Sequence, residues 1–299
     1  MKTVLTTLSN KLYKESRLQL NDSALKYGFN EVASYDYDDL KGTVFFEENK
    51  KLLLNPKGLG YWIWKPYILL ETMKKISEGD MIVYCDAGIE IIRSPVPLFD
   101  ICAAQPILLF ANGTLKNKMW TKRDAFILME ADSRKYWNGL QCDASFSVFK
   151  KCPESTRFVQ DWLRYCCDER VVTEKQNVCG KKNFWGYRQH RFDQSVLSLL
   201  AIKYNVPLHR MPSQYGNHYK MPEFRVPNEF NCVNQTRQRQ LKYYSKKPYY
   251  NSPYFQLLDH HRTKIISENF NKKKVPFLKA IFISGKRRWG KIMRLITRT

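Results

Sequence analysis

Short apolar runs alternate with segments of helical periodicity over the first 210 residues. The run Met81-Ile-Val-Tyr84 is fully apolar, as expected for a strand that is buried on both faces of a sheet. The side chains of Val196, Leu199 and Leu200 recur at positions i, i+3 and i+4, which is typical of an amphipathic helix. This alternation predicts an α/β fold in which helices connect the strands of a central sheet.

The same pattern places the individual elements. Strands are expected to begin at Val4-Leu5 and to lie at 31–35, 81–84, 89–92, 106–110, 144–149 and 207–210. Helices are expected at 18–27, from Pro66 to Gly79, at 153–166 and at 193–204. The periodicity ends beyond Met211, and residues 212–258, which are rich in Tyr, Asn, Pro and Lys, are expected to form long loops around the sheet.

The net charge of +22 is concentrated at the end of the chain. Residues 231–299 hold 17 basic and 2 acidic side chains, and residues 271–299 hold ten Lys or Arg, no carboxylate and many apolar side chains. Such a basic amphipathic tail fits an anionic lipid surface, a phosphate-rich polymer, or a solvated final helix that packs on the domain. We therefore divide the chain into a main domain at 1–230, a loop-rich extension at 231–270 that completes it, and this tail at 271–299.

The composition predicts a folded protein without disulfides. Hydrophobic residues make up 43% of the chain and aromatic residues 14%, which provides enough apolar surface for a sizeable core. The eight cysteines form no Cys-x-x-Cys pair and have no histidine at zinc spacing, so we expect reduced thiols. No apolar run is long enough to span a membrane, and charged Lys11 and Lys14 come too early for a signal peptide. We expect a soluble, cytoplasmic protein.

The junction after the apolar run at 81–84 is the first candidate site. Asp86, Ala87 and Gly88 follow this predicted strand, and ligands of open α/β sheets bind at the carboxyl ends of strands. A carboxylate there suits a ribose or a metal bound to a diphosphate, and a glycine allows close approach of the backbone. The alternative is an ordinary turn at the end of a strand.

The second candidate is the segment from Gly58 to Pro66. Lys65 comes just before a predicted helix, whose first N–H groups already favour an anion, so its ammonium would add charge for a diphosphate. Tyr61, Trp62 and Trp64 suit a stacking wall for a base or a sugar, although at least one of them is expected in the core.

The third candidate is the start of the predicted helix at 193–204. Asp193 and Gln194 open this helix, where a carboxylate suits either a general base beside an acceptor hydroxyl or a plain N-cap.

Three weaker sets complete the candidates. Trp120, Lys122, Arg123 and Asp124 lie in a predicted polar loop, where they fit phosphate and sugar contacts or a solvated surface. Gln141 and Asp143 precede the predicted strand at 144–149 and fit sugar hydroxyls or a turn. Histidines of the C-terminal part, His218 among them, are candidate metal ligands, although most such histidines bind no metal.

Taken together, the segments GYWIWKPYIL, IVYCDAGIEI, WTKRD, QCDAS and HRFDQSVLSLL resemble a bacterial or viral nucleotide-sugar glycosyltransferase of the GT-A fold. The resemblance covers about residues 1–210, with a weaker echo at 260–263. It implies one α/β domain with a central mixed, Rossmann-like sheet and a donor of the UDP-sugar type bound by the N-terminal half. It also implies an Asp-x-Asp motif that holds Mn²⁺ or Mg²⁺, of which Asp86 matches the first Asp while Gly88 replaces the second.

The resemblance assigns a role to each candidate. The expected donor-binding residues are Trp64, Lys65, Asp86, Ala87, Gly88, Lys122 and Arg123. The expected acceptor-binding residues are Trp120, Asp124, Gln141 and Asp143. Asp193 and Gln194 are the expected catalytic residues, and Asp86 with His218 the expected metal ligands.

The acceptor is expected to be a saccharide or a lipid-linked saccharide of polysaccharide biosynthesis. The basic tail would then keep a hexosyltransferase at the inner face of a membrane. Two other classes stay open: a nucleotidyltransferase or other nucleotide-phosphate enzyme, which needs two or three carboxylates around two metal ions, and a nucleic-acid-binding protein, for which no binding module is visible.

Overall fold

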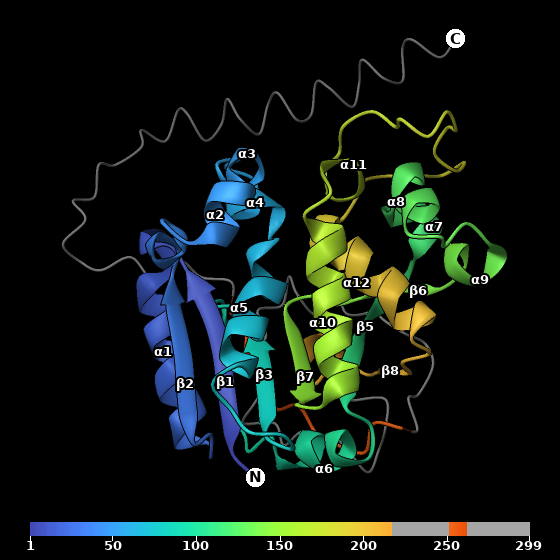
Figure 1. Cartoon of the computed structure of the whole chain (residues 1–299). Coiled ribbons are helices and arrows are strands. Elements are labelled where there is room, and N and C mark those ends of the chain that lie inside the picture. Colours follow the sequence, from blue (N-terminus) through green and yellow to red (C-terminus); the bar gives the residue numbers. More distant parts are fainter. Residues whose placement is uncertain (217–250, 262–299) are drawn as a thin grey trace, which may run out of the picture. The chain divides into compact units, whose positions relative to one another are not determined.

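The computed structural model describes residues 1–216 and 251–261, and a seven-stranded sheet forms its centre (Figure 1). The strands of this sheet are β1 (Thr3–Ser9), β2 (Glu31–Asp36), β3 (Met81–Cys85), β5 (Ile107–Lys116), β6 (Leu140–Cys142), β7 (Phe146–Lys150) and β8 (Leu208–His209). Their order is β2-β1-β3-β7-β5-β6, and β8 pairs with β5. The sheet is mixed, since β1 runs parallel to β2 and β3 whereas β7 runs antiparallel to β3 and β5. The predicted α/β architecture with a central mixed sheet is confirmed.

Helices cover both faces of the sheet because its strands alternate their apolar side chains between two cores. Val4 and Leu8 of β1 join the core that α5 (Trp64–Met73), α10 (Pro153–Cys166) and α12 (Phe192–Lys203) complete. Leu5 of the same strand joins the opposite core, with α1 (Lys14–Lys26) and α6 (Val96–Ala104).

The remaining elements are short. The other helices are α2 (Val44–Glu48), α3 (Lys50–Leu53), α4 (Gly58–Tyr61), α7 (Asn117–Trp120), α8 (Arg123–Leu128), α9 (Arg134–Trp137) and α11 (Glu169–Val172). Single 3₁₀ turns lie at Lys11–Tyr13, Tyr37–Leu40 and Gln214–Gly216.

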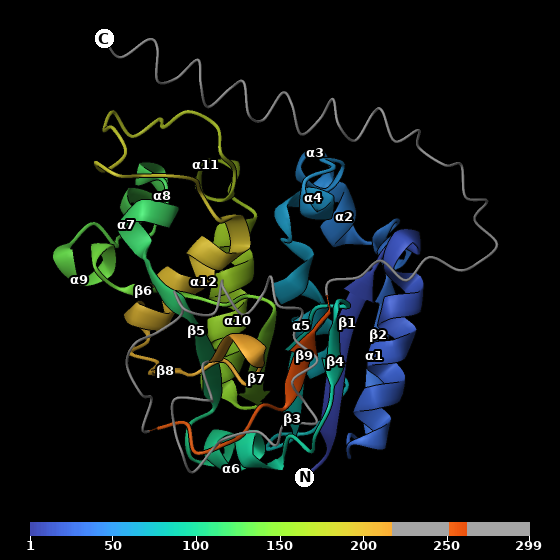
Figure 2. The same cartoon turned by 180° about the vertical axis from the view of Figure 1, so that it is seen from behind.

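A second, two-stranded sheet corrects the prediction for the region after Met211. The strand β9 (Leu258–His260) pairs antiparallel with β4 (Ile89–Ile91), so that His260 lies opposite Ile89, just beyond Asp86 (Figure 2). Residues 251–257, at the described end of the loop predicted at 212–258, contain no helix or strand, and the strand begins at the last residue of that range, Leu258. A three-residue strand is too short to show a period of two, and only its partner β4 identifies it.

Two other boundaries differ from the sequence prediction. The strand β5 runs to Lys116 instead of Phe110, because it continues past a shift in register that includes Gly113 at φ 59°. The helix expected to reach Gly79 ends at Met73 as α5. The other predicted helices and strands are found within a few residues of their expected bounds.

The described residues belong to one compact unit, Met1–Ile265. No described helix is long and apolar enough to cross a membrane. The seven described cysteines are all free thiols, as expected. The basic tail at 271–299, most of the extension at 231–270, and His218 lie outside the described residues.

Candidate functional site

Two adjoining chambers open at the carboxyl ends of β1 and β3. The wider chamber, of about 630 Å³, is lined by residues that follow β1 and β3, by Pro56, Gly58, Leu59, Trp62 and Trp64, and by Ser145 and His260. The narrower chamber, of about 390 Å³, lies between Lys57, Trp62, Lys65, the segment Asp143–Ser145 and the segment Gln189–Gln194, with Asp86 and Asn112. Trp62, Asp86 and Ser145 line both chambers, so the two form one continuous cleft.

Lys65 lies buried at the base of this cleft and binds protein oxygens. Its Nζ donates to the carbonyl of Ala144 at 2.9 Å, and lies 3.1 Å from Oδ1 of Asp86 and 3.5 Å from Oδ2 of Asp193. Burial by itself would lower the pKa of Lys65, but the carboxylates of Asp193 and Asp86 raise it above its usual value. The lysine is therefore charged, and it binds two carboxylates of the chain itself.

Asp86 is placed by the end of β3. Its backbone N–H donates to the carbonyl of Ser145 at 2.8 Å, and Oδ1 accepts a short hydrogen bond from the buried hydroxyl of Tyr84. About a third of its side chain remains exposed, at 36%. Ala87 and Gly88 follow it along the wall of the wider chamber. The structure thus brings Asp86 and Lys65 together at the cleft, where the sequence predicted that they would converge.

Asp193 lies in the first turn of α12, with its side chain only 5% exposed. Burial, together with Asp86, raises its pKa to about 7 against the opposing effect of Lys65. Its Oδ2 has no hydrogen-bond partner among the described residues. The N-cap of α12 is Arg191, so the alternative of a plain N-cap at Asp193 is wrong. A carboxyl group that is half-charged near neutral pH suits proton transfer.

A chain of amides fixes Gln194. Its Nε2 donates to Oε1 of Gln141 at 3.0 Å, and Gln141 in turn donates to Asn117 at 2.8 Å and to Thr121 at 3.0 Å. Gln141 is fully buried behind the cleft, so it supports Gln194 and does not line either chamber. Gln194 itself lines the narrower chamber.

Asp143 lines the narrower chamber together with Asp193. Its Oδ1 accepts from the backbone N–H of Ser145 at 2.9 Å and from the hydroxyl of the same serine. Its charge adds to those of Asp86 and Asp193 around Lys65. Three carboxyl groups face one ammonium, which makes the base of the cleft acidic when all are ionised.

A left-handed turn forms the wall between α3 and α5. Five successive residues, at 58–62, have φ between 54° and 90°, among them Leu59, Tyr61 and Trp62. Each non-glycine residue in this conformation costs about 1–2 kcal/mol. Such strain persists only where the surroundings impose it, and it collects at functional sites. Phe192, beside Asp193, is also left-handed, at φ 50°, and its ring packs against Tyr61 and Trp62.

The two glycines of this turn are required by space as well as by φ. A Cβ on Gly60 would lie 2.6 Å from Cα of Leu53, a backbone atom that cannot move aside. We expect Gly60→Ala to lower the free energy of unfolding by about 2–4 kcal/mol, since overpacking adds to the cost of the conformation. Gly79→Ala is the matched control, because Gly79 has a similar φ of 88° with open space around it, and it should cost about 1–2 kcal/mol. Equal losses in urea titrations of the two variants would contradict this account.

Residues 121–124 are buried and Trp120 is half-buried, so the segment does not form the polar loop that the sequence predicted. Lys122 and Asp124 form an ion pair at 3.1 Å with exposed fractions of 2% and 0%. Arg123 pairs with Asp132 at 2.8 Å and packs over the ring of Phe184. These side chains line neither chamber, so the structure does not bring them to the donor or acceptor positions expected for them. Trp120 also lies outside both chambers, beneath the guanidinium of Arg191.

Asp124 instead anchors the loop that leads into the cleft. Its carboxylate accepts from the backbone N–H groups of Val178 and Cys179 at 2.9–3.0 Å, and these hydrogen bonds help lower its pKa although burial opposes them. The same loop continues to Gln189, His190 and Arg191 on the wall of the narrower chamber.

Replacement of Asp124 should therefore destabilise the loop. Asp124→Asn leaves the buried ammonium of Lys122 with the carbonyl of Lys175 but without its carboxylate partner, and breaking a buried ion pair costs about 3–5 kcal/mol. Hydrogen exchange at Val178 and Cys179 should become faster than in the wild type. Unchanged exchange at these two amides would show that the carboxylate does not hold the loop.

Several residues of the cleft escaped the sequence analysis. Asn10 follows β1 just as Asp86 follows β3, so the rule of strand ends applies to it equally. Lys57 carries no motif, and Ser145, the last residue of the segment QCDAS, was assigned no role; only the fold places both at the cleft.

The described residues do not by themselves fit a Mn²⁺ or Mg²⁺ site. Among residues 1–216 and 251–261, no group of three His, Cys, Asp or Glu side chains is placed to hold a metal ion. Asp86 has no second carboxylate two residues later, and Lys65 and Tyr84 already bind its Oδ1. Dependence on a metal stays a prediction, as does the role of His218.

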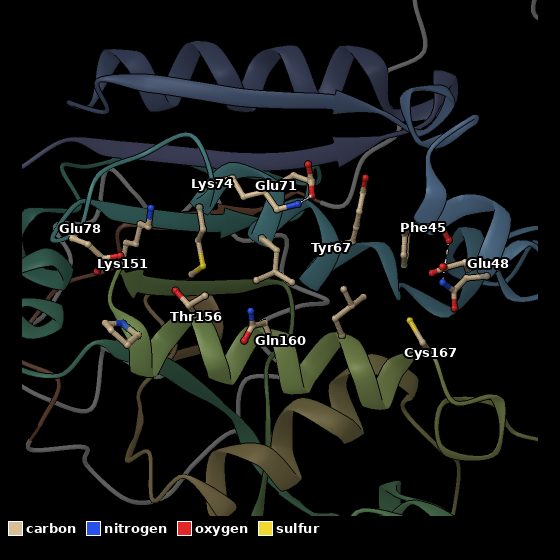
Figure 3. Close-up of a pocket in the computed structure, with 15 residues that line it drawn as sticks. Phe45, Glu48, Tyr67, Glu71, Lys74, Glu78, Lys151, Thr156, Gln160 and Cys167 are labelled. Carbon is tan, nitrogen blue, oxygen red and sulfur yellow. Dashed lines mark hydrogen bonds and ion pairs between the residues drawn. The ribbon is translucent and has the colours of Figure 1, made fainter.

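A third hollow of about 650 Å³ lies apart from the cleft. It runs between α5 and α10, with Tyr67, Lys74, Thr156, Gln160 and Cys167 among its lining residues (Figure 3). It shares no lining residue with either chamber.

The structural neighbours of the chain are glycosyltransferases. Mouse xyloside xylosyltransferase 1 in its apo form aligns with a TM-score of 0.46 and 11% identity, over 87% of this chain and 97% of that chain. The bifunctional glycosyltransferase WbbM aligns with a TM-score of 0.45 and 10% identity, over 88% of this chain and 46% of that chain. A glycosyltransferase involved in glycosylation of the major capsid of PBCV-1 aligns with a TM-score of 0.41 and 10% identity, over 87% of this chain and 94% of that chain.

No protein-family model matches the sequence, and no curated protein matches it. Likeness at these TM-scores does not establish a shared activity, and the function is inferred from the cleft itself.

Proposed function

We propose that the chain is a glycosyltransferase that moves a sugar from a nucleotide-sugar donor, of the UDP-sugar type, to a saccharide or a lipid-linked saccharide. The observation that carries this proposal is that two adjoining chambers share Asp86 in their lining, and that a second carboxyl group, that of Asp193, lines the narrower one. A transfer between two bound molecules needs two adjoining sites and a group that takes a proton between them.

The wider chamber suits the donor. It lies at the carboxyl ends of the parallel strands β1 and β3, where nucleotides bind in open α/β sheets. Trp62 and Trp64 border it, and the partly exposed ring of Trp62 offers apolar surface to a base or a sugar. Its mouth joins the narrower chamber at Asp86, which is the place for the diphosphate and the transferred sugar.

The narrower chamber suits the acceptor. In the transfer, the bond from the anomeric carbon to the diphosphate oxygen breaks, and its electron pair leaves with the nucleoside diphosphate. The acceptor oxygen forms the new bond, and its proton passes to Asp193. In a retaining enzyme the same carboxylate would bind the acceptor hydroxyl instead of deprotonating it first.

The leaving diphosphate needs positive charge, since its negative charge grows as the bond breaks. The charge of Lys65 offsets the carboxylates at the base of the cleft, and two further cationic side chains, those of Lys57 and Arg191, line the narrower chamber. Mn²⁺ or Mg²⁺, the predicted cofactor, would add charge at the diphosphate. Dependence on the metal is tested by comparing the release of nucleoside diphosphate in the presence of Mn²⁺ with its release in the presence of EDTA.

The experiment that tests the proposal is a turnover assay with UDP-, GDP-, CMP- and dTDP-sugars. Wild-type protein should release the nucleotide from one class of donor, slowly into water and faster when a suitable saccharide is added, and mass spectrometry should find the saccharide heavier by one sugar. No release from any donor, with or without Mn²⁺, would contradict the proposal.

The membrane part of the proposal rests on the tail at 271–299, whose charge and apolar residues suit an anionic surface near a lipid-linked acceptor. Deletion of these residues should reduce sedimentation with anionic vesicles. Unchanged partitioning would remove the membrane role and leave the transferase proposal intact.

The described residues favour glycosyl transfer over the alternatives. A nucleotidyltransferase needs two or three carboxylates around two metal ions, whereas the carboxylates of this cleft surround a lysine in the part of the chain that the structure describes.

A further inference from the structure

Trp62 lies where the two chambers adjoin. It lines the wider chamber beside Trp64 and the narrower one beside Lys65, and it is half-buried. Of the residues that line both chambers, it is the one with a large apolar ring.

The left-handed turn holds this ring in place. Trp62 has φ 60° and ends the turn, and a Cβ on Gly58 would lie only 2.3 Å from its indole, so the ring rests directly on the glycine backbone. The ring also packs against that of Phe192, with centroids 5.6 Å apart and the ring planes tilted by 38°. Phe192 precedes Asp193, so one aromatic contact joins the wall of the donor chamber to the carboxyl group of the acceptor chamber.

Trp62 and its neighbour Trp64 are used differently. The indole N–H of Trp64 donates to the carbonyl of Gly58 at 3.0 Å, and this side chain is only 5% exposed. Trp64 therefore stabilises the turn, whereas the partly exposed ring of Trp62 presents apolar surface to the cleft.

We propose that Trp62 is a substrate-positioning residue that contacts both the transferred sugar of the donor and the acceptor. This inference rests on the proposed function and names the residue that sets the distance between the two reacting groups. An indole offers its apolar face to the C–H groups of a sugar ring, and a rigid ring loses little conformational freedom when it does so. A ring fixed between the reactants also excludes water from the anomeric carbon.

The test uses Trp62→Ala and Trp62→Phe in the full-length protein, with the donor that the wild type turns over. We expect Trp62→Ala to raise both the donor Kd and the acceptor KM by about tenfold, which is the loss of one good aromatic contact on each side. The share of donor lost to water, relative to transfer, should rise as well. Trp62→Phe keeps an aromatic ring and should show smaller changes in the same direction.

Trp185→Ala is the matched control, since that tryptophan is 97% exposed and lines neither chamber. It should match the wild type in all three measurements. The inference would be overturned by a folded Trp62→Ala or Trp62→Phe variant in which only one of the donor Kd and the acceptor KM changes, or neither does. Turnover by the wild type tests the proposed function. The Trp62 inference is tested separately, by the ratios of donor Kd, acceptor KM and donor hydrolysis between variant and wild type.

Discussion

Asp193→Asn should lower kcat by about 10²–10⁴-fold, the usual contribution of a positioned general base. The amide keeps the size of the carboxyl group but cannot accept the proton of the acceptor. Donor binding, followed as a rise in Tm with the nucleotide sugar, should stay close to that of the wild type, because Asp193 lines only the narrower chamber. Asp22→Asn, on the exposed surface of α1, is the control and should be fully active.

The pH dependence of the wild type follows from the same group. Burial raises the pKa of Asp193 to about 7, so kcat/KM should reach half of its maximum near pH 7 and level off above that pH, where the carboxylate is fully formed. The Asp193→Asn variant should lack this rise of kcat/KM with pH. A wild-type profile that is flat between pH 5.5 and 8, or an Asn variant with more than a tenth of the wild-type kcat, would refute the role of Asp193.

Asp193 also predicts the sign of a stability change. Its folded pKa is raised above the unfolded value, so the native state binds more protons than the unfolded state between about pH 4 and 7. The free energy of unfolding due to this group is therefore highest below pH 4 and falls as the pH rises to about 7.

The second large effect is expected for Lys65→Met. The substitution leaves Asp86 and Asp193 facing each other without the buried cation, and loss of one member of a buried ion pair costs about 3–5 kcal/mol. The loss should be larger at pH 8 than at pH 5.5, because protonation of the carboxyl groups relieves their repulsion at low pH. Activity should fall at least as far as in Asp193→Asn, since both carboxyl groups lose their position.

Lys74→Met is the control for this variant. Lys74 pairs with Glu71 at the surface, with 69% of its side chain exposed, and an exposed pair contributes at most about 1 kcal/mol. Urea titrations at the two pH values should separate the variants clearly. Similar losses for Lys65→Met and Lys74→Met would show that Lys65 does not hold the carboxylates.

The sequence predicted helices and strands well where their burial leaves a clear pattern of apolar residues. The strand at 81–84 was found as a continuous apolar run that is buried on both faces of the sheet, and the helix at 193–204 was found because its buried apolar residues recur at about 3.6 positions. The strand β9 was missed, since its three residues show no period and its existence depends on pairing with β4, about 170 residues earlier in the chain.

The candidate site was predicted in part for a related reason. Strand ends and helix starts are local signals, and they led to Asp86, Lys65 and Asp193, which the structure brings to one cleft. The charge of a side chain does not by itself show whether that side chain is exposed. Lys122 and Asp124 were expected in a polar loop, but each is the buried partner of the other, and only tertiary contacts reveal this. The partners of Lys65 were equally hidden, so the sequence suggested a diphosphate contact where the fold supplies two carboxylates.

The most direct test of the donor site is a thermal-shift panel of UDP-, GDP-, CMP- and dTDP-sugars, with and without Mn²⁺, on the wild type and on Asp86→Ala. One nucleotide class at about 100 times its Kd should stabilise the wild type by about 2.7 kcal/mol, or roughly 5 °C or more in Tm, and Asp86→Ala by much less. Equal shifts in both proteins, or no shift with any donor, would contradict a nucleotide-sugar site built around Asp86.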